Sequence, residues 1–334
     1  MGIRRPTLHI RIRKWLKLCL NYRYDYRRFL SYSGATRVDG DQHVKSTLQA
    51  LITMDYHRIE KGLALSNPRP GFGADVLIRL FRDIRLHLKK YGHDHLLDIA
   101  ANCIQKYCDF HNAIEFDVAS VVERLRRLKE ELTEHAPPLC GTKTASRESV
   151  LASIPSDVEQ FFYSRSSVRS FTDEAVDKDL IENAVRIAQT SPSVCNRQSW
   201  KVYVGCDAKT NEEILKLQNG NRGFRDEVKS VMVVTSDLRK FVSVGERNQA
   251  WIDGGMFSMS LVYGLHSQGL GSCCLNWSVE KEQDIALKRL LNIPDNEVII
   301  MLIAAGHLRD SYEVACSPRN DLAEVAQFIE PENS

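Results

Sequence analysis

Apolar residues recur at intervals of three and four through residues 73–91, with Arg and Lys on the opposite face. This spacing is typical of an amphipathic helix. Residues 95–114 and 117–135 repeat the pattern, and the short connections between the three segments favour antiparallel packing. We therefore predict an all-helical N-terminal region over residues 45–135. No period recurs regularly enough to indicate a solenoid.

The periodicity is lost in residues 136–155, which contain Pro137, Pro138 and Gly141 and are interpreted as a linker. Beyond the linker, short apolar runs alternate with helical patterns, which predicts a mixed α+β domain over residues 156–330. Ser156 and Glu159 have the spacing of a capping box, which indicates the start of a short helix. Further helices are expected at 177–189, 208–218, 245–268 and 280–291, and strands at 201–205, 231–235, 271–275 and 298–305.

The first thirty residues are strongly basic: Asp25 is their single acid, and aromatic and aliphatic residues are interleaved with the cations. Such a segment can lie on an anionic membrane or bind a partner. We favour instead a basic N-terminal arm, solvated or packed, over residues 1–44. The apolar run at residues 15–20 is too short for a signal-peptide core or a membrane span. A soluble, cytoplasmic protein is therefore expected.

Composition adds few constraints. The chain has 334 residues, of which 43% are hydrophobic, enough for a sizeable core. Its 45 Lys and Arg nearly balance 43 Asp and Glu, so no overall charge favours nucleic acid as a partner. The nine cysteines are odd in number and have no zinc-site spacing, which favours free thiols and no metal.

Residues 56–73 combine titratable side chains with a stretch rich in Pro and Gly. The segment could be a lid or a substrate-binding loop. It could also be the end of a helix, with cations near its C-terminus, followed by a turn. We favour the second interpretation. The residues concerned are His57, Arg58, Glu60 and Lys61, followed by Pro68, Pro70, Gly71 and Gly73.

Two polar motifs of the second half indicate chemistry. The first, Arg165-Ser-Ser-Val-Arg-Ser-Phe171, places two guanidinium groups and several hydroxyls where they could hold an anion. The second, Ser191-Pro-Ser-Val-Cys-Asn-Arg-Gln-Ser-Trp200, follows a predicted helix that its proline ends, and it leads into a predicted strand. Neither motif alone is specific, because each could be an ordinary surface loop.

Together, in this order, the two motifs resemble the signature of the nitroreductase family, R-x-S-x-R/K-x-F followed by P-S-x-x-N-x-Q-P-W. The resemblance extends over residues 157–328. It includes Gly269-Leu-Gly-Ser-Cys-Cys-Leu275, Gly306-His307 and Pro318-Arg-Asn-Asp-Leu-Ala-Glu-Val325. It implies a nitroreductase-like fold, in which helices flank a central, mainly antiparallel sheet. It also implies an obligate homodimer with two FMN sites at its interface.

The resemblance assigns cofactor-binding roles but no catalytic residue. Arg169 would meet the pyrimidine edge of FMN, and Arg319 its phosphate. Ser193 and Asn196 would reach the FMN held mainly by the other subunit. Backbone donors of β-strand residues near Cys274 would lie close to N5. The complete set of expected FMN ligands is Arg165, Ser166, Ser167, Arg169, Pro192, Ser193, Asn196, Gln198, Asn221, Cys274, Leu275, Asn276 and Arg319.

The chain departs from the family pattern at three points. Ser199 stands where the family has proline, and Asn320 where it has lysine, so Arg309 is a candidate replacement cation. The helical N-terminal half lies outside the minimal pattern; it resembles long forms associated with cell-surface polysaccharide synthesis. Small residues in 254–264 would suit the close helix–helix contact of a dimer.

The resulting hypothesis is an FMN-dependent oxidoreductase. NAD(P)H would reduce the flavin, which would then reduce a small nitro- or quinone-like acceptor in ping-pong fashion. The alternative is a flavin-fold partner or regulatory protein without turnover in cell-surface polysaccharide biosynthesis. The sequence holds no G-x-G-x-x-G after a predicted strand, no P-loop, no H-E-x-x-H and no G-x-S-x-G.

Overall fold

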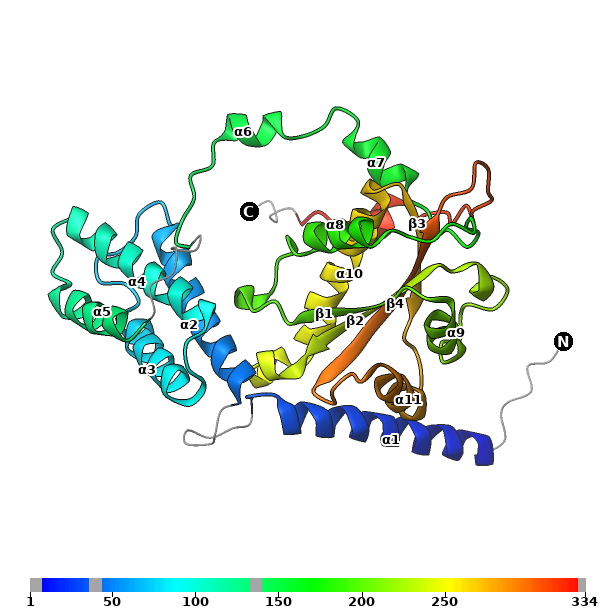
Figure 1. Cartoon of the computed structure of the whole chain (residues 1–334), viewed down its shortest axis with the longest axis horizontal. Coiled ribbons are helices and arrows are strands. Elements are labelled where there is room, and N and C mark those ends of the chain that lie inside the picture. Colours follow the sequence, from blue (N-terminus) through cyan, green and yellow to red (C-terminus); the bar gives the residue numbers. More distant parts are fainter. Residues whose placement is uncertain (1–7, 36–43, 133–139, 330–334) are drawn as a thin grey trace, which may run out of the picture.

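The computed structural model describes residues 8–35, 44–132 and 140–329, shown in Figure 1. Arg4 and Arg5 of the basic arm, and Pro137 and Pro138 of the expected linker, lie outside the described residues. The remaining parts form a helical region, a sheet with helices on both faces, and a long first helix that lies beneath the sheet (Figure 1).

The helical region comprises α2 (Lys45–Leu63), α3 (Ala74–Tyr91), α4 (His95–Ala113) and α5 (Ala119–Glu131). The apolar faces of these helices bury one core of their own, which includes Ile52, Leu80 and Ile104. The helices expected from periodicity are confirmed within a few residues. The expected end of the last helix, at residue 135, lies outside the described residues.

The sheet has four strands, β1 (Trp200–Gly205), β2 (Ser230–Asp237), β3 (Leu270–Asn276) and β4 (Glu297–His307). Their order is β1-β2-β4-β3, and every neighbouring pair is antiparallel. The two inner strands are apolar on both faces because both faces are covered. The two edge strands, β1 and β3, carry the two predicted motifs at or beside them.

Helices cover both faces of this sheet. On one face, α8 (Lys178–Ala188) and α10 (Gln249–Ser267) pack with Met232 and Ile303. On the other, α9 (Ala208–Lys216) and α11 (Lys281–Leu291) pack with Val233 and Leu302. The chain therefore has the predicted fold class: an α+β domain with a central antiparallel sheet flanked by helices, preceded by a helical region.

Small residues of α10 pack against other elements of the same chain. This corrects the expectation that the small residues in 254–264 form the helix–helix contact of a dimer. A Cβ at Gly264 would lie 2.6 Å from the carbonyl oxygen of Ala184 on α8. A Cβ at Gly254 would lie equally close to Ile300 on β4. Gly255 faces open space. Two of these glycines are thus explained by close contacts inside one chain rather than by a second chain.

Two local expectations also differ from the structure. The segment interpreted as a linker contains a short helix, α6 (Arg147–Ala152), whose capping box is formed by Ser146 and Ser149. The capping box expected at Ser156 is absent. α7 (Val158–Ser164) begins instead after Asp157, which makes no side-chain cap bond. A last helical turn, α12, spans Leu322–Val325.

The basic N-terminal segment is a continuous helix, α1 (Leu8–Tyr32), that lies against α11 (Figure 1). Lys17 pairs with Glu280 at 2.8 Å, and the Tyr24 hydroxyl donates to Asp284 at 2.7 Å. Arg28 is buried and donates to the carbonyl oxygen of Asp295. Among the described helices, none combines the length and the apolar character that crossing a membrane requires.

Candidate flavin site and comparison with known proteins

The first motif lies along the free edge of β3. The Val168 amide donates to the carbonyl oxygen of Ser272 at 2.9 Å, and the Thr172 amide donates to that of His307. Between them, Phe171 is fully buried against Gly306, where any Cβ would collide with the ring. The first motif is therefore held beside the sheet by two isolated bridges, from Ser167 to Ser272 on β3 and from Phe171 to Leu308 just after β4.

The cations of this motif face β3 without carboxylate partners. Neither Arg165 nor Arg169 forms an ion pair among the described residues, and Arg169 is exposed. Burial raises the pKa of the Cys273 thiol, while the positive charge of Arg169 acts to lower it. Arg165 lies close enough to Cys274 to act on its thiol in the same sense. The two guanidinium groups thus bring unneutralised positive charge to this edge of the sheet.

The backbone of β3 presents donors to the same edge. Because the Ser272 carbonyl faces residues 166–168, strand alternation directs the Cys274 N–H to this side, away from β4. The Cys274 side chain is exposed, whereas Leu275 is buried in the core and can contribute only its backbone. Cations and a free N–H group therefore lie along one strand edge.

A hydrogen-bonded cluster extends this edge at its far end. Gln218 donates to the carbonyl oxygen of Asn276 at 3.0 Å and accepts from Asn221 at 2.9 Å. Asn221 is completely buried, and its amide also donates to the carbonyl oxygens of Leu215 and Gln218. Asn221 therefore shapes the loop that follows α9, and its own side chain has no remaining donor.

The two arginines considered for a phosphate differ in their surroundings. Arg309 donates to Ser170 at 2.9 Å and pairs with Glu227 at 3.2 Å, and Glu227 also accepts from the Phe171 amide. Arg309 thus fixes the first motif. Arg319 is exposed in the C-terminal tail, where it donates to the carbonyl oxygen of Ser317. Among the described residues, Arg319 forms no hydrogen bond or ion pair with the other candidates.

The second motif forms a compact loop between α8 and β1. Cys195, Asn196 and Gln198 all have positive φ, between 46° and 54°. Residues other than Gly and Asn rarely adopt this backbone conformation. The Ser193 hydroxyl stabilises the loop by accepting from the Gln198 amide at 3.0 Å. Pro192 and Gln198 are exposed, and Asn196 is half-buried.

A buried arginine anchors this loop. The Arg197 side chain is fully buried, pairs with Glu246, and donates to the carbonyl oxygens of Val194 and Lys240. Burial acts to raise the pKa of Glu246, but hydrogen bonds from Arg197 and the Val242 amide hold it below its ordinary value. Burial raises the pKa of Asp253, which accepts from the Val194 amide.

The departure from the family pattern at Ser199 has a local explanation. Its side chain is buried, and its hydroxyl lies 2.8 Å from that of Ser236 on β2. Trp200 follows and stacks on Phe257 of α10, with ring centroids 4.9 Å apart. At the position where the family has proline, a hydroxyl–hydroxyl hydrogen bond thus links the residue before β1 to β2.

The structure does not bring the two motifs together within one chain. The first lies beside β3 and the second at the start of β1, and these are opposite edges of the sheet. The second motif instead meets the helical region, where the Tyr56 phenol of α2 lies against Asn196. Burial raises the pKa of Tyr56 to about 12.

The rest of residues 56–73 packs on α4. The Gly71 amide donates to His111 at 2.9 Å, and the Tyr107 hydroxyl donates to the carbonyl oxygen of Phe72. The Phe72 ring fills the space beside Gly62, where a Cβ would lie 2.1 Å from it. These contacts agree with a helix end followed by a packed turn.

Residues 163–221 and 216–307 match the sequence model of the Nitroreductase family. An Archaeoglobus fulgidus protein named "Putative NADH dehydrogenase/NAD(P)H nitroreductase" is 26% identical over 157 residues, covering 45% of this chain and 85% of that protein. Residues 163–307 of the chain therefore carry the sequence pattern of the nitroreductase family.

Solved structures of low sequence identity are also similar to this part of the chain. The Nitroreductase Family Protein from Streptococcus pneumoniae TIGR4 is 22% identical, with a TM-score of 0.45, and the match covers 52% of this chain and 100% of that one. The FMN-dependent Nitroreductase from Clostridium difficile R20291 is 20% identical, with a TM-score of 0.43, covering 51% and 98%.

Three residues that organise the candidate site were not singled out from the sequence. Gln218 links Asn221 to Asn276, Arg197 anchors the second motif, and Glu227 holds the first. Arg197 lies inside the second motif. A charged residue in a segment otherwise suited to a turn could have indicated from the sequence that this side chain has a structural role. Gln218 and Glu227 have no comparable signal, because the bonds of Gln218 to Asn276 and of Glu227 to Phe171 join residues more than fifty positions apart.

Proposed function

We propose that this protein is an FMN-dependent oxidoreductase that takes electrons from NAD(P)H and passes them to a small nitro- or quinone-like acceptor. The observation that carries the proposal is the hydrogen bond between Val168 and Ser272, because it joins two family motifs that lie about a hundred residues apart. The expected ligands beside β3 become neighbours through that bond.

The residues of this edge fit a flavin nucleotide. Arg165 and Arg169 offer positive charge without a carboxylate partner among the described residues, as an anionic phosphate and a polarisable pyrimidine edge require. The Cys274 N–H offers a donor on the same edge. When bound, FMN would supply two-electron transfer between a nicotinamide and an acceptor. The chain's own residues would bind and orient it.

A second chain is part of this proposal. The pocket beside Arg165 and Ser166 measures only about 20 Å³ within one chain, far less than a flavin occupies. Asn196 and Ser193, the ligands expected from across the interface, lie at the other edge of the sheet. α10 also exposes an apolar row, Ile252, Met256 and Met259, that a second copy could cover.

The edge of β1 supports the same arrangement. An apolar groove of about 730 Å³ lies between α8 and β1 and is lined by Val185, Val202 and Phe257. The C-terminal tail projects Val325, Phe328 and Ile329, each at least 73% exposed. A tail of this kind would bury its apolar side chains by adding to an edge strand of a second copy.

The visible absorption spectrum of the purified protein tests the cofactor. We expect flavin bands that bleach when NADH or NADPH is added under anaerobic conditions and return with an acceptor. A preparation that stays colourless after incubation with FMN would contradict the proposal. Bands that never bleach would favour the alternative, a flavin-fold partner protein without turnover.

Mixed dimers test whether the site is shared. Arg169→Ala and Asn196→Ala chains, each expressed alone, should lose flavin from both sites. Co-expressed, random pairing would restore an intact Arg169 and Asn196 to about a quarter of the sites. Recovery of that flavin fraction supports a shared site, and no recovery places both residues in a site of one chain or outside it. Met256→Glu, measured by sedimentation velocity, tests the α10 interface separately.

A further inference from the structure

The first helix exposes an apolar row on the face opposite its contacts. Lys17, Asn21 and Tyr24 face α11 and bond to it. Half a turn away, six residues at intervals of three or four follow the outer face of the helix. This row, here termed the apolar stripe, consists of Ile12, Trp15, Cys19, Tyr22, Tyr26 and Leu30.

The apolar stripe is open to solvent along its length. Trp15, Tyr22 and Tyr26 are 63%, 67% and 63% exposed. Single exposed apolar side chains are common, but a continuous row of them marks a surface that something covers. The N-terminal end of α1 also extends past α11, so no described element of this chain covers it (Figure 1).

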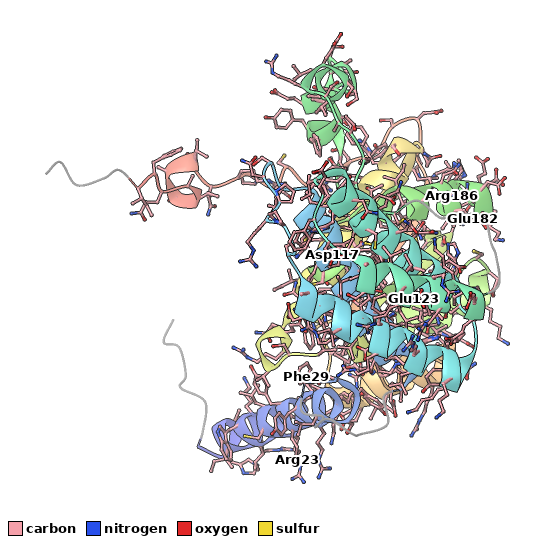
Figure 2. All side chains as sticks on the ribbon, turned by 90° about the vertical axis from the view of Figure 1, so that its left-hand side faces the viewer. Arg23, Phe29, Asp117, Glu123, Glu182 and Arg186 are labelled. Carbon is pink, nitrogen blue, oxygen red and sulfur yellow. The ribbon has the colours of Figure 1, made fainter. Side chains whose placement is uncertain are left out.

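Cations accompany the stripe on one flank. Arg23 and Arg27 are exposed beside it and form no ion pair among the described residues. Figure 2 shows Arg23 on the outer side of α1, whereas Phe29 points toward the sheet domain. Across a groove of about 970 Å³, α11 adds Lys281 and Arg289.

Glu282 pairs with Lys281 at 3.6 Å, but the acids near this groove form no ion pair with Arg23 or Arg27 among the described residues. Asp284 is engaged by Lys288 at 3.0 Å and by the Tyr24 hydroxyl. Burial raises the pKa of Asp25, the single acid of α1, and the charges that act on it are Arg28, Asp284 and Lys288 on the inner side. The flank formed by Arg23 and Arg27 therefore keeps its positive charge.

The charge pattern selects among the surfaces that could cover the stripe. A second copy of α1 would bring two helices together that each hold seven Arg and Lys against one acid: Arg11, Arg13, Lys14, Lys17, Arg23, Arg27 and Arg28 against Asp25. Such a pair repels itself. An uncharged apolar partner would leave Arg23 and Arg27 without counter-charges. An anionic bilayer would both cover the apolar stripe and supply counter-charges for Arg23 and Arg27.

We propose that α1 docks the protein flat on an anionic membrane surface. The stripe would enter the boundary between headgroups and acyl chains, where Trp and Tyr side chains are favoured. The stems of Arg23 and Arg27 would follow the apolar surface while their guanidinium groups meet lipid phosphates. The helix lies on the membrane and does not cross it, consistent with its charge.

Sedimentation with lipid vesicles tests the proposal on the full-length protein. We expect binding to vesicles that contain phosphatidylglycerol, weak binding to pure phosphatidylcholine, and release at high salt. The double variant Trp15→Glu/Tyr22→Glu should abolish binding. Arg23→Ala/Arg27→Ala should weaken it about 25-fold, at roughly fivefold for each cation lost.

Matched controls lie on α3 of the helical region. Ile78→Glu changes an apolar residue of similar exposure, 60%, and Lys89→Ala/Lys90→Ala removes two exposed cations. Both should bind vesicles like the unchanged protein. No binding to phosphatidylglycerol vesicles, or equal losses in the α3 controls, would overturn the proposal. So would self-association in sedimentation velocity that depends on Trp15 and Tyr22 without lipid binding. Retained flavin absorbance, or circular dichroism where flavin is absent, reports folding in each variant.

Discussion

The Val168 amide and the Ser272 carbonyl oxygen, 104 positions apart in the sequence, are joined by a hydrogen bond of 2.9 Å. This single contact aligns Arg165 and Arg169 with the outward N–H of Cys274. It also explains why the first motif is weak as an isolated sequence pattern. Its arginines become a candidate binding surface only when the strand beside them supplies backbone donors.

Replacing Arg169 with Ala should weaken FMN binding while the fold persists. An exposed cation that pairs with no carboxylate can be removed without leaving a buried charge behind. Loss of one charged hydrogen bond typically lowers affinity about tenfold or more. Titration of the apoprotein with FMN, followed by fluorescence quenching, measures this. Arg186→Ala, which removes an exposed arginine of α8 (Figure 2), is the control and should bind normally.

Removing the buried Arg197 should destabilise the protein strongly. Arg197→Met leaves the Glu246 carboxylate buried without its partner, and such losses typically cost about 3–5 kcal/mol. Urea denaturation measures the free energy of unfolding. The double variant Arg197→Met/Glu246→Gln should recover part of the loss, because no uncompensated charge remains. Arg126→Met, which breaks an exposed pair with Glu123, should change stability little. Equal effects of the buried and exposed changes would show that Arg197 does not anchor the loop.

Two glycines of α10 should respond in opposite directions to alanine. Gly264→Ala places a Cβ 2.6 Å from the Ala184 backbone oxygen and should cost about 1–3 kcal/mol. Gly255→Ala enters open space in the same helix and should gain up to about 1 kcal/mol from helix propensity. Thermal or chemical denaturation of the two variants side by side decides this. A neutral Gly264→Ala would mean that α8 and α10 can separate at little cost.

The buried Lys288 should make stability rise with pH above neutrality. Burial lowers its pKa from 10.5 to about 8, against the attraction of Asp284. Between these values the unfolded chain holds a proton that the folded chain has released, so raising the pH favours the folded state. The slope for one proton is at most about 1.4 kcal/mol per pH unit. Urea denaturation from pH 8 to pH 10 should show this rise, and Lys288→Met should remove it.

The Tyr24 phenol limits the pH range over which the rise in stability can be measured. Burial and the nearby Asp284 raise the pKa of its phenol, so the folded chain retains a proton that the unfolded chain loses above pH 10. Stability should therefore fall again above pH 10. Charges facing Lys288 from other elements are Arg28 on α1 and Asp295 after α11. Identical pH profiles for Lys288→Met and the unchanged protein would exclude Lys288 as the source of the rise.

Periodicity was sufficient to predict most helices and strands, because residues such as Leu80 and Val233 sit at positions whose burial follows directly from spacing. Family motifs supplied the candidate ligands. Neither source could predict Gln218 or Glu227, since their hydrogen bonds depend on loops brought together by the completed sheet. Gly264 was misassigned for a related reason: small residues permit close approach but do not specify the neighbour.

The role of the N-terminal arm also could not be predicted from the sequence alone. Its composition left an arm, a partner-binding segment and a membrane-binding segment open. The choice now depends on which side of the helix packs on α11, and Tyr24 and Arg28 determine that through bonds to residues more than 250 positions away.

Those bonds also determine where the protein can be truncated for expression. A fragment that starts at residue 156 would match the family's usual boundaries, yet it would strip α1 from α11 and leave Asp284 and Lys288 facing water. The sheet domain is thus completed by α1, Leu8–Tyr32, and the helical region lies between the two in the sequence. A shorter expression fragment would need α1 joined back to it by a designed connection.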